Sequence, residues 1–259
     1  MRSVQAIMLL LFSVATFGQK YPNLIKEWKS YPVPANEDTL DKYNLAREDW
    51  ILMKQDGEIH VAVLAEYYTH YKGEELPFDI KPDERPVLKL RGKKTVLAVN
   101  DGYLAGYDRG EWSGELYWFS KDGKNKYEVR SGNIVKLITR DNKNYAIEGL
   151  AHLSISRGSI IQIERVEGKW QANEYVHLGI APYAIALDSK NNFIVATGKD
   201  LISVDTNAGV TTLVDSAIWH AHLYPTSMII ENDIVYVGMR KGVYKFNLVT
   251  KKEEWLLPY

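Results

Sequence analysis

Two histidines lie two positions apart, a spacing that could bring both imidazoles to one metal ion. They are His220 and His222, in the stretch from Trp219 to Pro225. On an extended segment, side chains two positions apart point to the same side, so both rings would face one site. Such a pair could hold a transition metal or orient an acid group. We expect a protein without a cofactor, and the alternative is that it binds one divalent metal. In the other interpretation, the pair lies in a connecting loop and packs beside Trp219 and Tyr224.

A carboxylate and an imidazole follow an apolar run that starts at Ala146. Glu148 and His152 are these two groups. A glutamate in apolar surroundings can have a raised pKa and carry a proton, so the two residues are candidates for acid–base catalysis. The alternative is structural, with the Glu148 carboxylate satisfied by a backbone amide or by Arg157.

Other residues could bind a ligand without any chemical step. Arg240 lies in a turn, where its guanidinium could bind a carboxylate through two parallel hydrogen bonds. Tyr107 and Trp112 crowd an aromatic-rich stretch, and Tyr183 opens a repeated unit. Aromatic faces of this kind bind sugar rings or peptide side chains, and the alternative is that they fill the space between sheets. Tyr67 and its aromatic neighbours are expected in a loop.

Short β-strands separated by turn residues must position these groups. From Asp49 onward, β-branched and aromatic runs alternate with turns in a four-strand pattern that recurs about every 40 residues, which is typical of propeller blades. The sequence therefore predicts an all-β fold, a single β-propeller over residues 49–259 with about five four-stranded blades. The predicted units are 49–92, 93–132, 133–178, 179–217 and 218–259. A sixth blade completed by the preceding segment is one alternative, and a β-sandwich or barrel is another.

One unit also carries a family resemblance. Its runs Pro182–Asp188, Asn192–Gly198 and Leu201–Asp205 resemble the repeat of NHL-type and gluconolactonase-like propellers. The resemblance covers the fourth unit well and the fifth loosely, so it implies a fold and transfers no catalytic site. Members of those families use either surface recognition or a metal-bearing central channel, and a propeller fold alone does not choose between them.

The first residues are typical of an export signal. Arg2 precedes the apolar run Ala6–Phe12, and small residues continue to Gly18, which predicts a signal peptide over residues 1–18. The apolar run is shorter than the ~20 residues of a membrane-spanning helix, so no span is expected. Residues 19–48 form a lead-in segment with a short helix expected over 39–46. We expect a bacterial periplasmic or secreted protein, monomeric, whose final strand closes the ring by pairing with the first unit.

Composition narrows the function further. Lys and Arg total 32 against 33 Asp and Glu, so no strong field attracts nucleic acid. There is no Cys, which removes thiol catalysis and disulfides. The sequence favours a non-catalytic scaffold that binds a protein, peptide or glycan through loops at one face. The alternative is a metal- or acid/base-dependent hydrolase or lyase, with the histidines and Glu148 converging at one end of the channel.

Overall fold

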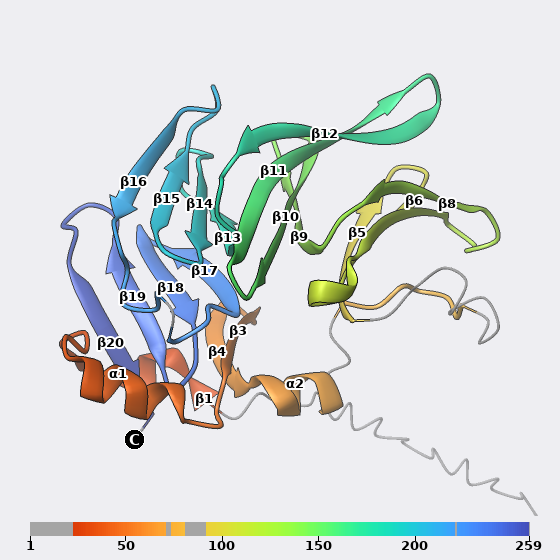
Figure 1. Ribbon diagram of the computed structural model, residues 1–259. Helices are drawn as coiled ribbons and strands as arrows, with labels where there is room; N and C mark the ends of the chain where they lie inside the picture. The colour runs from red at the N-terminus through yellow and green to blue at the C-terminus, as the bar shows by residue number, and fades with distance from the viewer. Residues whose placement is uncertain (1–22, 71–73, 81–91, 221, 259) are drawn as a thin grey trace, which may run out of the picture.

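The computed structural model describes residues 23–70, 74–80, 92–220 and 222–258, and the predicted signal peptide lies outside them. Five antiparallel sheets stand around a central axis (Figure 1). Four neighbouring pairs of sheets, running from the second blade round to the first, meet through their first strands, with contacts from β5 to β9, from β9 to β13, from β13 to β17 and from β17 to β3. The predicted all-β, five-bladed propeller is confirmed.

The second, third and fourth blades are four-stranded meanders whose bounds match the predicted units. The second blade contains β5 (Lys93–Val99), β6 (Gly102–Asp108), β7 (Glu115–Ser120) and β8 (Lys126–Ser131). The third contains β9 (Ile134–Arg140), β10 (Lys143–His152), β11 (Ile155–Val166) and β12 (Lys169–His177). The fourth contains β13 (Pro182–Leu187), β14 (Phe193–Thr197), β15 (Leu201–Val204) and β16 (Val210–Val214).

The lead-in segment completes the first and fifth blades and does not form a sixth. The first blade contains β3 (Trp50–Gln55), β4 (Glu58–Val63) and the lead-in strand β1 (Asn23–Leu24). The fifth contains β17 (Ser227–Glu231), β18 (Ile234–Gly238), β19 (Val243–Asn247), β20 (Glu253–Leu257) and the lead-in strand β2 (Lys29–Tyr31). The final strand β20 therefore pairs with β2, and the expected pairing with the first unit is wrong. The lead-in segment therefore joins the fifth blade to the first by pairing with a strand of each.

Two helices lie on one side of the ring. The predicted short helix is α1 (Glu37–Asn44), which starts two residues earlier because the Asn36 side chain caps it, accepting a hydrogen bond from the Thr39 amide at 2.8 Å. Helix α2 (Leu64–His70) replaces the loop expected around Tyr67. Among the described helices, none is long and apolar enough to cross a membrane.

Residues 74–80 cover the side of the second blade. Leu76, Phe78 and Ile80 pack against the buried cluster of that blade. The ring of Phe78 lies 5.9 Å from those of both Tyr103 and Phe119, measured between centroids. Burial of these side chains holds the segment in place and brings its first residue, Glu74, to the channel.

The connections leave the ring at two opposite faces because consecutive strands are antiparallel. We call one of them the loop face. It carries α2, the links between successive blades, and the turns β6–β7, β10–β11, β14–β15 and β18–β19. It is the lower side in Figure 1, where α2 lies. The predicted candidates outside regular strands, Trp112, His220, His222 and Arg240, all lie on this face.

Candidate ligand-binding site at the channel mouth

The central channel contains a cavity of about 500 Å³. Residues from the first strand of every blade line it, because the five strands β3, β5, β9, β13 and β17 surround the axis. Helix α2 contributes Tyr67 and Tyr68 at the loop face. This volume falls within the range of small-ligand pockets.

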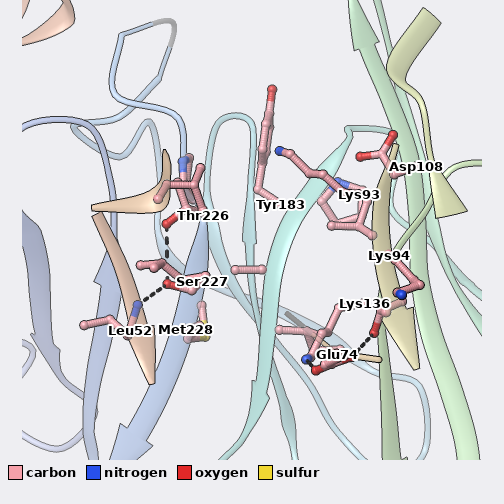
Figure 2. A pocket seen from close by; sticks show the side chains of 18 of the residues that line it. Leu52, Glu74, Lys93, Lys94, Asp108, Lys136, Tyr183, Thr226, Ser227 and Met228 are labelled. Carbon is pink, nitrogen blue, oxygen red and sulfur yellow. Dashed lines mark hydrogen bonds and ion pairs between the residues drawn. The ribbon is translucent and has the colours of Figure 1, made fainter. Parts of the chain in front are cut away.

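Two opposite charges at the mouth of the cavity are not paired with each other. Lys93 begins β5 and Asp108 ends β6, where the antiparallel register places them directly opposite. The structure shows no ion pair within 4.0 Å for either side chain among the described residues. Asp108 Oδ1 accepts a hydrogen bond from the Gly110 amide at 2.8 Å. Lys93 instead extends toward Tyr183 (Figure 2). Both charges are therefore available to a ligand.

Two phenols flank this charge pair. Tyr68 is 45% exposed, and its partial burial, followed by the nearby Asp108 carboxylate, raises its pKa above the usual value. Burial also raises the pKa of Tyr183, with smaller contributions from Tyr224 and Asp108. Asp108 thus lies near both rings, and both phenols stay protonated at neutral pH. Tyr183, predicted to bind a ligand, stands in the cavity as Figure 2 shows.

The charges deeper in the cavity are satisfied within the protein. The Glu74 carboxylate accepts hydrogen bonds from Thr95 Oγ1 and from the Val96 amide, each at 2.8 Å, and pairs with Lys136 Nζ. Burial alone would raise the pKa of Glu74, but the Lys136 charge and these hydrogen bonds outweigh it and lower the pKa. Lys94 pairs with Glu75 in the same way. The charges left for a ligand are those of Lys93 and Asp108.

The predicted acid–base pair lies elsewhere. Glu148 binds Arg130 in bidentate fashion, at 2.8 Å to Nε and 2.6 Å to NH2, and also accepts from Ser159 Oγ at 3.0 Å. Its partner is thus Arg130, where Arg157 was predicted. Glu148 lines a second, polar groove of about 340 Å³ beside the second and third blades. His152 Nε2 lies 3.0 Å from Glu111 Oε2 at the surface.

The two histidines lie in a turn between β16 and β17. The amides of His220 and His222 donate to the carbonyls of Ala217 and Trp219, so the extended geometry expected for this segment is wrong. His222 Nε2 lies 3.4 Å from Asp41 Oδ1, and its Nδ1 lies 2.8 Å from the His220 carbonyl. The cavity lining includes neither histidine, nor Glu148 or His152. Within the described ranges, no group of three or more His, Cys, Asp or Glu residues is placed to hold a metal ion.

The remaining predicted ligand-binding residues differ in their surroundings. Arg240 Nε donates to Asp49 Oδ1 at 3.0 Å, and NH1 donates to the Asn44 carbonyl and side-chain oxygen at 3.1 and 2.9 Å. Its guanidinium therefore ties the lead-in segment to the fifth blade, and these contacts disfavour a ligand role. Tyr107 is buried in the second blade, which also disfavours the role predicted for it. Trp112 is 72% exposed on the loop face.

Sequence reasoning did not single out Lys93. It expected the stretch that begins at Asp108 to shape one rim of a site and placed Tyr68 in an aromatic loop, without assigning a ligand-binding charge to Asp108. A signal existed for Lys93, because the start of each blade's first strand reaches the channel at the loop face. Asp108 and Tyr68 needed the three-dimensional arrangement, since one ends a second strand and the other lies on an unpredicted helix.

The fold and this cavity define a five-bladed β-propeller with a ligand-sized central site. No protein-family model matches the chain, and no curated protein matches it. Among solved structures, it is similar to the extracellular domain of a protein described as a hybrid two-component system from B. thetaiotaomicron, at 14% identity and a TM-score of 0.49. That match covers 82% of this chain and 26% of the other, so the chain spans about a quarter of that extracellular domain.

Two further solved structures are similar to parts of this chain. A protein described as a gluconolactonase matches at 10% identity and a TM-score of 0.40, over 60% of each chain. A chain of the nidogen/laminin complex matches at 12% identity and a TM-score of 0.46, over 83% of this chain and 77% of that one. At these identities and TM-scores the matches carry no argument of their own. The five-bladed fold of the chain is what agrees with the fold-level resemblance to gluconolactonase-like propellers.

Proposed function

We propose that this protein is an exported, non-catalytic recognition protein that binds a peptide, protein or glycan at the loop face. The observation that carries the proposal is the cavity mouth, where Lys93 and Asp108 stand unpaired between the phenols of Tyr68 and Tyr183. A concave site with a few convergent polar groups and aromatic walls is the usual form of a binding pocket. It offers charge and aromatic surface for recognition.

Apolar side chains beside the mouth extend this surface. Trp112 is 72%, Leu153 94% and Ile155 52% exposed. Trp112 lies in the β6–β7 loop, Leu153 in the neighbouring β10–β11 turn, and Ile155 at the start of β11. The contact of 3.0 Å between His152 Nε2 and Glu111 Oε2 joins the same two connections. Exposed apolar side chains that gather in one place favour an interaction surface. A partner larger than the cavity would cover this area while one of its groups enters the channel.

The alternative of a channel-centred hydrolase or lyase has less support. It needed His220, His222, Glu148 and His152 to converge at one end of the channel. Glu148 is held by Arg130 in the separate groove, and His222 lies beside Asp41 on the lead-in helix. The arrangement therefore favours recognition by the cavity mouth over catalysis by these four residues.

Binding to peptide and glycan arrays tests the proposal. The purified protein is compared with Lys93→Met and Asp108→Asn, and with the control Lys190→Met, which removes an exposed lysine from the β13–β14 turn on the opposite face. We expect at least one class of probe to bind the wild type and the control, and to bind the two mouth variants at least about tenfold more weakly. Probes bound equally well by all four proteins, or by none, would refute the proposed site.

A further inference from the structure

The charges at the cavity mouth also indicate which ligands would bind best. Resting on the proposed function, we infer that the site takes a zwitterionic ligand of the amino-acid class, a free amino acid or a dipeptide. Its carboxylate would bind the Lys93 ammonium, and its ammonium would bind the Asp108 carboxylate. No bond is made or broken in this step.

The first argument is the balance of charge in the cavity. Glu74 is paired with Lys136, Glu75 with Lys94, and Lys54 with Glu231, so these charges are already compensated. One cation and one anion remain. A ligand with a single charge would pair with one of these two groups and would displace water from the other without giving it a partner, which is unfavourable. A zwitterion gives each charge a partner.

The second argument is the relative position of the two groups. Lys93 and Asp108 are directly opposite in the β5–β6 register, so their side chains leave the same side of the sheet at the same depth. Such neighbours often pair with each other, yet here their charged ends lie more than 4.0 Å apart. Figure 2 shows the reason: Lys93 points away from Asp108 and toward Tyr183. A small ligand with both charges fits between these two ends.

The third argument is the chemistry of the walls. Tyr68 and Tyr183 present aromatic faces and neutral hydroxyl groups to the space around Asp108. Aromatic rings attract an ammonium group through their electron-rich faces, and the hydroxyls can donate to a carboxylate. The cavity of about 500 Å³ has room for a dipeptide.

Isothermal titration with four probes tests the inference. They are L-alanine, L-alanyl-L-alanine, the same dipeptide N-acetylated, and the same dipeptide as its C-terminal amide. We expect alanine or the free dipeptide to bind, and each blocked dipeptide to bind at least about tenfold more weakly than the free one. Which of the two unblocked probes binds more tightly tells whether the site is built for an amino acid or a dipeptide.

The mouth variants assign each charge. Lys93→Met should bind the free dipeptide no more tightly than its C-terminal amide. Asp108→Asn should bind the free dipeptide no more tightly than its N-acetylated form. Lys190→Met should keep both preferences. Equal binding of the free and blocked dipeptides, or no binding of either unblocked probe, would overturn the inference. If an array probe nevertheless binds in a Lys93-dependent way, the proposed function stands and only the zwitterion fails. If no probe responds to the mouth variants, both fail.

Discussion

Replacing Trp28 by alanine should weaken the closure of the ring. Trp28 lies in the lead-in segment between β1 and β2 and is 8% exposed. Its ring meets that of Trp50 edge to face, with centroids 4.8 Å apart. The cluster around them combines residues of the lead-in, the first blade and the fifth blade, including Val61 and Leu256. One side chain therefore serves both blades that the ring must join.

The size of the effect follows from burial. Truncating a buried tryptophan to alanine costs about 3–5 kcal/mol, and the edge-to-face pair is part of that loss. The lower end applies if the lead-in moves inward to fill the space. For a domain of this size, each kcal/mol lowers the melting temperature by about 2–4 °C, so a decrease of roughly 6–20 °C is expected.

Denaturant unfolding followed by far-ultraviolet circular dichroism measures the loss. Trp112→Ala is the matched control, because it removes the same side chain from a position that is 72% exposed, and it should cost less than about 0.5 kcal/mol. Hydrogen exchange in β4 and β20 should also accelerate in Trp28→Ala, since both strands pair with the lead-in. If Trp28→Ala and Trp112→Ala unfold at the same denaturant concentration, the lead-in does not close the ring.

Three further predictions concern charged groups. Arg240→Met should destabilise the protein by about 1–2 kcal/mol in denaturant unfolding, because Asp49 and Asn44 lose their shared donor. An unchanged unfolding midpoint would show that Arg240 does not link the lead-in segment to the fifth blade. Glu148→Gln should cost about 1–3 kcal/mol by the same assay, because Arg130 loses a bidentate partner; equal stability would argue against a structural role. Hydrogen bonds from Ser30 and from two lysines lower the pKa of Glu254 from 4.5 to about 2. The ionised Glu254 carboxylate therefore contributes fully to folding stability above about pH 4.5, and this contribution is lost as the pH falls toward 2. Melting curves of wild type and Glu254→Gln should therefore differ at pH 7 and converge near pH 2.

The blades were predictable from local chemistry. Turn residues such as Asp188 and Asn192 separate strands of β-branched and aromatic residues, and their hydrogen bonds in the structure form those turns. The partner of β20 was not predictable, because strand pairing across the ring depends on which distant edge is open. Helix α2 escaped prediction because its seven residues are rich in aromatic side chains, which occur equally well in loops and strands.

The candidate site was predicted only in part. Tyr183 was found because it opens a well-marked unit. His220 and His222 misled because their spacing has a meaning only on an extended segment, and the backbone there turns. Arg240 was predicted to bind a ligand because nothing near it in the sequence could pair with its guanidinium. Its partners Asn44 and Asp49 lie almost two hundred positions earlier, where no local pattern could reveal them.

The pairing of β2 with β20 also sets the order in which the molecule can be finished. Ser30 and Glu254, which join these strands by a 2.7 Å hydrogen bond, are 224 positions apart. The lead-in is among the first parts of the ring to be synthesised, yet it waits for almost the whole chain before its partner exists. A product that stops before β20 leaves β19 and the lead-in strand β2 without their partner, and such exposed strand edges invite aggregation or degradation. For a chain that we expect to be exported, late completion also gives time for passage before the ring closes.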